Sequence, residues 1–133
     1  MSQSFVKEVQ KECLSDIIRG IPIARNYNRR KKVDKTLFRN CMCAFDIETT
    51  YLDEIEQSIM YIWQFAVMDL RTENIWYCFG RTWEEFIELL NSFYSDGITV
   101  MIWVHNLSYE FQFMRHWFLL GKTRYLLSSR ERL

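Results

Sequence analysis

The stretch CMCAFDIETT, residues 41–50, places two acids in an apolar run that is typical of a buried β-strand. Asp46 and Glu48 are two positions apart, so their side chains point to the same face of an extended chain. Two carboxylates in an apolar setting repel each other and lose hydration, which is costly unless a cation or a partner neutralises them. The stretch therefore predicts a strand and raises the question of what its acid pair binds.

The segments that follow predict an α/β or α+β fold. Apolar patterns and turn signals indicate strands at 58–70, 74–80 and 98–105, helices at 82–94 and 108–120, and a further strand from 124. Thr82 and Glu85 form the pattern of a capping box, which favours a helix start at this point. Three consecutive strands followed by alternating helix and strand predict a mixed sheet flanked by helices.

The region before residue 41 differs in charge from the rest. Residues 1–40 contain ten Lys/Arg and four Asp/Glu, a net charge of +6, whereas residues 41–133 contain seven and thirteen, a net charge of −6. An apolar stripe predicts a helix over 4–19 that ends at Gly20, and the polar stretch 24–35 is typical of a basic linker or arm. We therefore divide the chain into a helix with a basic arm, residues 1–37, and a main domain, residues 38–133.

Composition excludes several classes of protein. The chain has 133 residues, of which 49% are hydrophobic and 17% aromatic, which indicates one globular domain rather than disorder. Its apolar runs are too short to span a bilayer, and its first residues lack the apolar core of a signal peptide. We expect reduced, buried cysteines rather than a zinc site, because the four cysteines lack zinc-finger spacing. We thus expect a cytoplasmic protein without a membrane partner.

The acid pair alone is weak evidence for a site. With 17 acids in 133 residues, chance gives about two pairs at this spacing. Two are present, Asp46/Glu48 and Glu54/Glu56, but the second pair lies in a polar loop where solvated acids need no explanation. Asp46 and Glu48 instead end an apolar strand, and sites in α/β sheets collect at strand ends. Carboxylates at such a position suit Mg²⁺ or Mn²⁺.

A second group of polar residues follows the predicted strand at 98–105. The stretch WVHNLSYEF, residues 103–111, offers His105, Asn106, Tyr109 and Glu110 at the start of the next predicted helix. Each has a structural explanation: a hydrogen-bonded His, a turn-forming Asn, a first-turn acid and an aromatic core residue. A parallel sheet would nevertheless bring Glu110 near Asp46, and Tyr109 offers an aromatic face to an unpaired base.

Together, AFDIETT and VHNLSYEFQFM resemble the first two exonuclease motifs of the proofreading domain in family B DNA polymerases. The resemblance is strongest to the protein-primed polymerases of tailed phages and related mobile elements, and it covers roughly residues 38–128. It implies an RNase H-like exonuclease fold, to which the helix predicted over 4–19 is an addition outside the resemblance. It also implies hydrolysis of single-stranded DNA from its 3′ end by two divalent ions, Mg²⁺ or Mn²⁺.

The resemblance assigns roles to residues one at a time. Asp46, Glu48 and Glu110 correspond to catalytic metal ligands, although the family usually has Asp where Glu110 stands; 61 residues separate Glu110 from Glu48. Five residues correspond to contacts with the single strand: Thr49, His105, Asn106, Leu107 and Tyr109. The basic cluster of Arg29, Arg30, Lys31 and Lys32 lies outside the resemblance and is a candidate for phosphate contact, the alternative being a solvated tether.

One family motif has no counterpart. The third exonuclease motif supplies a Tyr and an Asp, but after Glu110 the chain has no Asp, and its one later acid is Glu131. We therefore expect the front part of a proofreading domain, incomplete at its C-terminal side, with weak or no hydrolysis. It would be part of a longer polymerase or a natural shortened derivative in a bacterial host cell. The alternative is a non-catalytic module that binds single-stranded nucleic acid or a protein partner, including a second copy of itself.

Overall fold

The computed structural model describes residues 3–27, 33–95, 97–104 and 113. It has two mixed β-sheets and two α-helices, so the expected α+β class is confirmed. The elements are, in chain order, β1 (Val6–Glu8), α1 (Lys11–Gly20), β2 (Ile23–Tyr27), β3 (Val33–Arg39), β4 (Cys41–Leu52), β5 (Gln57–Asp69), β6 (Ile75–Gly80), α2 (Trp83–Phe93), β7 (Ile98–Thr99) and β8 (Ile102–Val104).

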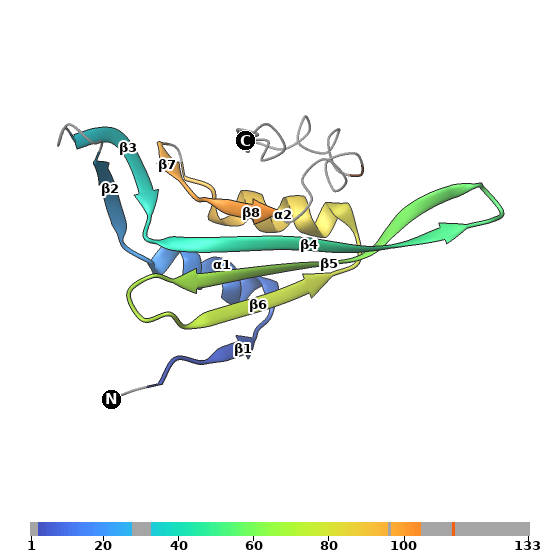
Figure 1. Ribbon diagram of the computed structural model, residues 1–133, viewed down its shortest axis with the longest axis horizontal. Coiled ribbons are helices and arrows are strands. Elements are labelled where there is room, and N and C mark those ends of the chain that lie inside the picture. Colours follow the sequence, from blue (N-terminus) through green and yellow to red (C-terminus); the bar gives the residue numbers. More distant parts are fainter. Residues whose placement is uncertain (1–2, 28–32, 96, 105–112, 114–133) are drawn as a thin grey trace.

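The larger sheet has five strands in the order β1-β6-β5-β4-β8 (Figure 1). Strands β4, β5 and β6 form an antiparallel meander, and the edge strands β1 and β8 each run parallel to their neighbour. Alternation along β4 and β5 turns one set of side chains to the core, including Phe45 and Phe65. The three strands predicted from CMCAFDIE to NIWYCFG are confirmed.

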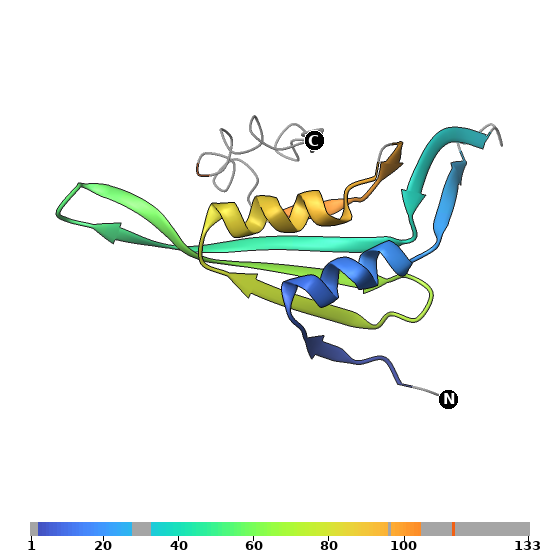
Figure 2. The same ribbon diagram turned by 180° about the vertical axis from the view of Figure 1, so that it is seen from behind.

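The core lies on one face of this sheet. Both helices pack on that face, as the view from behind shows (Figure 2). Phe86 of α2 stacks on Phe45 with ring centroids 4.3 Å apart, and Leu14 and Ile18 of α1 are fully buried in the same cluster. In the part of the chain that is described, no helix has the length and apolar character needed to cross a membrane.

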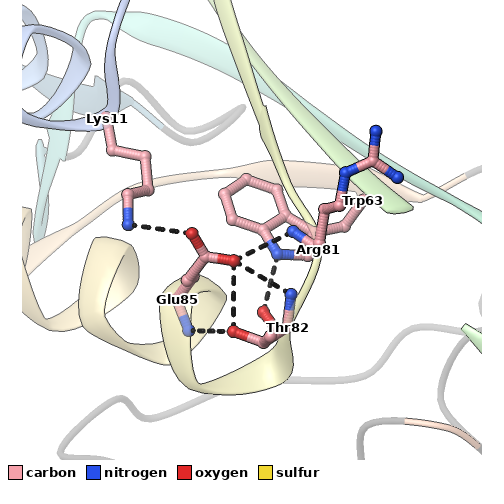
Figure 3. A network of polar contacts seen from close by, with 5 residues as sticks. All are labelled: Lys11, Trp63, Arg81, Thr82 and Glu85. Atoms are coloured by element: carbon pink, nitrogen blue, oxygen red, sulfur yellow. Dashed lines mark hydrogen bonds and ion pairs between the residues drawn. The ribbon is translucent and has the colours of Figure 1, made fainter. Parts of the chain in front are cut away.

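The N-terminus of α2 is fixed by the predicted capping box, which is confirmed (Figure 3). The Thr82 hydroxyl accepts a hydrogen bond from the Glu85 backbone N–H at 3.2 Å, and Glu85 Oε1 accepts from the backbone N–H of Thr82 at 3.0 Å. Lys11 Nζ lies 3.4 Å from Glu85 Oε2 and so joins α1 to α2. The buried Trp63 donates from Nε1 to the Thr82 carbonyl at 2.8 Å, which connects the cap to β5.

The stretch 24–35, which we expected to be a linker, instead contains paired strands. Strand β2 runs antiparallel to β3, and β3 runs parallel to the short strand β7, which gives a second sheet of three strands. Arg39 donates from Nη1 to the carbonyls of Arg19 and Ile21 at 3.1 and 3.0 Å, so this sheet is joined to the end of α1. The antiparallel pairing of β2 with β3 accounts for the strands in this stretch, and the local polarity of the sequence does not indicate it.

The predicted helix over 4–19 is wrong at its start. Residues Val6–Glu8 form strand β1, and the helix begins only at Lys11, although it ends at Gly20 as expected. Phe5 accepts a backbone hydrogen bond from Ile75 at 2.8 Å, and its ring packs on Trp76 at 5.3 Å. Pairing with the edge of β6 therefore overrides the helical pattern of the first residues.

The single buried strand predicted at 98–105 is also wrong. It consists of two short strands in different sheets, since β7 pairs with β3 and β8 pairs with β4. Met101, Ile102 and Trp103 are exposed rather than buried. The helix predicted at 108–120 and the strand predicted from 124 lie outside the described residues, except that Phe113 packs against the core.

The cysteines belong mainly to the core. Cys41, Cys43 and Cys78 are buried as expected, whereas Cys13 is exposed on α1. Burial raises the pKa of the Cys78 thiol to about 12. This thiol is therefore protonated and unreactive at neutral pH.

Candidate metal and nucleic-acid site

Strand β4 presents its acid pair on the face of the sheet opposite the helices, which we call the open face. Phe45 and Ile47 point into the core, so Asp46 and Glu48 point away from it, and both are exposed. The expected apolar burial of the two carboxylates is therefore wrong, and no burial cost arises. The prediction that they share one face is confirmed.

The strand does not end after Glu48, as we expected, but continues to Leu52. Residues Thr49–Leu52 pair with Gln57–Met60, so the β4–β5 hairpin extends beyond the rest of the sheet as a two-stranded arm (Figure 1). The acid pair thus lies within the strand, where the sheet narrows to this arm. The second acid pair, Glu54 and Glu56, lies exposed in the turn at the tip of the arm, as predicted.

A register shift immediately follows the acid pair. Glu48 pairs with Ile62 but Thr49 pairs with Met60, so the register skips Tyr61. The extra residue reverses the alternation of β5, which is why Met60 is buried while Tyr61 is exposed. Such bulges bend and twist a strand and are common beside active sites.

Strand β8, which precedes the second predicted motif, is the edge strand beside β4. It runs parallel to β4, and Val104 pairs with Phe45. The residue before His105 therefore lies beside the residue before Asp46. The expected parallel pairing of these two strands is confirmed, whereas the expected approach of Glu110 to Asp46 lies outside the described residues.

Most of the other predicted site residues lie outside the described residues. These are His105, Asn106, Leu107, Tyr109 and Glu110, together with the basic cluster Arg29, Arg30, Lys31 and Lys32 in the connection between β2 and β3. Thr49 is described, and it is half-buried. Within the described ranges, no three acidic, His or Cys side chains form a group that would hold a metal ion.

The described pair offers two hard oxygen ligands to a cation. The α-carbons of residues two apart on a strand are about 6.5–7 Å apart, so the carboxylates of Asp46 and Glu48 can approach one divalent ion or a closely spaced pair of ions. Mg²⁺ uses one or two protein carboxylates and keeps water and substrate phosphates as its other ligands. The chemistry of the donor pair therefore fits such an ion.

The structure also shows a groove on the open face that the sequence did not reveal. It has a volume of about 640 Å³ and runs beside Asp46 across the five strands of the larger sheet. Its lining includes Ala44, Gln64, Ala66, Tyr77 and Trp103. In the sequence, Gln64 and Ala66 alternate with Trp63, Phe65 and Val67, which are buried, and this alternation indicates that Gln64 and Ala66 lie on the open face. The groove itself depends on the register between strands.

No protein-family model, curated protein or solved structure matches this chain. The fold and the acid pair therefore define it only as an α+β chain with a mixed sheet and two exposed carboxylates on its open face.

Proposed function

We propose that the open face of β4 contributes the metal-binding acids of a 3′–5′ exonuclease site that acts on single-stranded DNA. One observation carries the proposal: β8 pairs parallel to β4, with Val104 opposite Phe45. This pairing supports an arrangement in which the residues after Val104 face the same substrate as Asp46. The RNase H-like fold and the relation to phage-type family B polymerases belong to this proposal.

In the proposed site, Asp46, Glu48 and Glu110 bind the divalent ions. When bound, Mg²⁺ or Mn²⁺ lowers the pKa of a water molecule and neutralises charge on the phosphate undergoing attack. Thr49, His105, Asn106, Leu107 and Tyr109 hold the terminal nucleotides, with Tyr109 stacking on a base. The basic residues Arg29, Arg30, Lys31 and Lys32 contact phosphates further along the strand.

We expect this site to be slow. The Glu110 side chain is one methylene longer than the Asp that family B polymerases usually have at this position, and Mg²⁺ requires near-ideal octahedral geometry. Hydrolysis should therefore be measurable only with protein in excess over DNA.

The experiment is a degradation assay on single-stranded oligonucleotides with Mn²⁺ and excess protein. We expect a 3′ label to be released as mononucleotide while a 5′ label remains on a ladder of shortened products. Asp46→Ala should abolish release, since removal of a metal ligand removes the activated water. Glu54→Ala is the matched control, because Glu54 belongs to an acid pair with the same spacing at the tip of the arm, and it should retain the wild-type rate.

Two outcomes would contradict the proposed activity. Internal cleavage, or equal release by wild type and Asp46→Ala, would exclude an exonuclease site at Asp46. Salt-sensitive strand binding without cleavage, weakened when residues 29–32 are neutralised, would favour the non-catalytic binding module.

A further inference from the structure

The groove on the open face has an ordered floor and two aromatic walls. Register pairs place Trp103 opposite Ala44, Ala44 opposite Ala66, and Ala66 opposite Tyr77. These four residues therefore form one row across β8, β4, β5 and β6. Because neighbouring strands are about 4.8 Å apart, the two aromatic residues lie about 14 Å apart at their α-carbons.

The alanines leave room between these walls. Side chains stand roughly perpendicular to a sheet, and two methyl groups form a flat, low floor between the two rings. Stacked aromatic rings have centroids about 4.5–7 Å apart, so a planar ring midway between Trp103 and Tyr77, about 7 Å from each, lies at the upper end of this range. The groove volume of about 640 Å³ is within the usual range for small-molecule sites.

The next row along the strands is polar. Asp46 pairs with Gln64, and Gln64 pairs with Phe79, so a carboxylate and an amide lie two residues beyond the alanine floor. The Gln64 amide is both a donor and an acceptor, which suits the edge of a heterocyclic base. Asp46 then remains available for the proposed cation.

Charge narrows the choice of ligand. Among the described residues, those that line the groove include Asp46 but no Lys or Arg. A bare phosphate is therefore repelled, whereas an uncharged nucleoside is accepted and a nucleotide needs a bridging divalent ion. Trp103 is 49% exposed, so its ring can stack on a ligand without rearrangement of the core.

We infer that this groove binds one nucleobase, stacked between Trp103 and Tyr77 over Ala44 and Ala66, with its edge at Gln64. The choice of a nucleotide ligand rests on the proposed function, because the groove adjoins the acid pair. The base bound here belongs to a nucleotide whose phosphate reaches the ion held by Asp46.

The test is calorimetric titration of the full chain with deoxyadenosine and with thymidine, in the absence of divalent metal. Wild type should bind at least one of them. Loss of a stacking partner costs about 1–3 kcal/mol per base, so Trp103→Ala and Tyr77→Ala should each weaken binding by about 5-fold to 150-fold. Ala44→Leu should weaken binding by a similar factor, because the larger side chain fills the space above the floor. Tyr51 is an exposed aromatic residue on the β4–β5 hairpin, and Tyr51→Ala should have no effect.

The outcome is separable from that of the proposed activity, since these nucleosides carry no phosphate and need no metal. Absence of nucleoside binding by wild type, or binding by Trp103→Ala and Ala44→Leu that is as tight as that of wild type, would overturn the inference. So would a preference for trimethyl-lysine, or a dimer that Trp103→Ala dissociates, because each would identify a different occupant.

Discussion

At the scale of single residues, Gly80 and Trp63 show how closely the core is fitted at the start of α2. They are register partners on β6 and β5, and Trp63 is fully buried. A Cβ atom at Gly80 would overlap the indole ring of Trp63. The absence of a side chain at Gly80 therefore allows the indole to lie flat on β6 and to donate to the Thr82 carbonyl.

Gly80→Ala should destabilise the fold. The indole must move to accommodate the methyl group, and overpacking of this kind costs about 1–3 kcal/mol. Urea unfolding should show a lower midpoint for this variant. Gly20→Ala is the control, because a Cβ at Gly20 has no neighbour within 4 Å; equal midpoints for the two variants would contradict the packing.

The sequence pattern predicted that the side chains of Asp46 and Glu48 point to one face of the strand, but it did not predict what surrounds them. Alternation in CMCAFDIETT is enough to place Asp46 and Glu48 on one face. Whether that face is buried depends on which elements cover the sheet, and both described helices cover the opposite face. Trp103 and Tyr77 lie in one row only because four strands pair in register, so no short stretch of sequence predicts this arrangement.

At the scale of elements, local signals predicted those elements whose structure is locally determined. The helix α2 has its capping box and apolar stripe in one short segment, and its bounds matched the expectation within a residue. Strand β1 was missed because it is held by pairing with the distant strand β6, and the strand predicted at 98–105 divides in two because β7 pairs with β3 in the other sheet. Strand β4 was predicted too short because its last residues pair only within the hairpin.

Glu85→Ala should weaken the start of α2. The backbone N–H of Arg81 and then that of Thr82 donate to Glu85 Oε1, which lowers the pKa of this carboxyl below its ordinary 4.5. Since the pKa is lowered in the folded state, the contribution is complete above pH 4.5 and is lost as the pH falls through the folded-state value. At neutral pH we expect a loss of about 0.5–1 kcal/mol, at the low end for caps because the carboxylate is partly solvated.

Glu84→Ala is the matched control for this prediction. Glu84 shares the first turn of α2 but takes no part in the capping box. Urea unfolding at neutral pH should show a lower midpoint for Glu85→Ala than for Glu84→Ala, and the difference should shrink in acid. A difference that is independent of pH would show that the carboxylate is not responsible.

At the scale of the whole molecule, the two faces of the five-stranded sheet differ in structure, and the two parts of the sequence differ in net charge. One face of the five-stranded sheet carries the helices and the core, and the other presents the acid pair and the groove. The sequence is basic before residue 41 and acidic after it, with net charges of +6 and −6. This division suits a protein that holds an anionic strand with one part and binds cations with the other.

The most direct test of the central claim is calorimetric titration of the whole chain with Mn²⁺. We predict saturable binding by wild type that is abolished in the Asp46→Ala variant and retained in the Glu54→Ala variant. Absence of binding in wild type, or equal binding by the two variants, would contradict a metal site at Asp46 and Glu48.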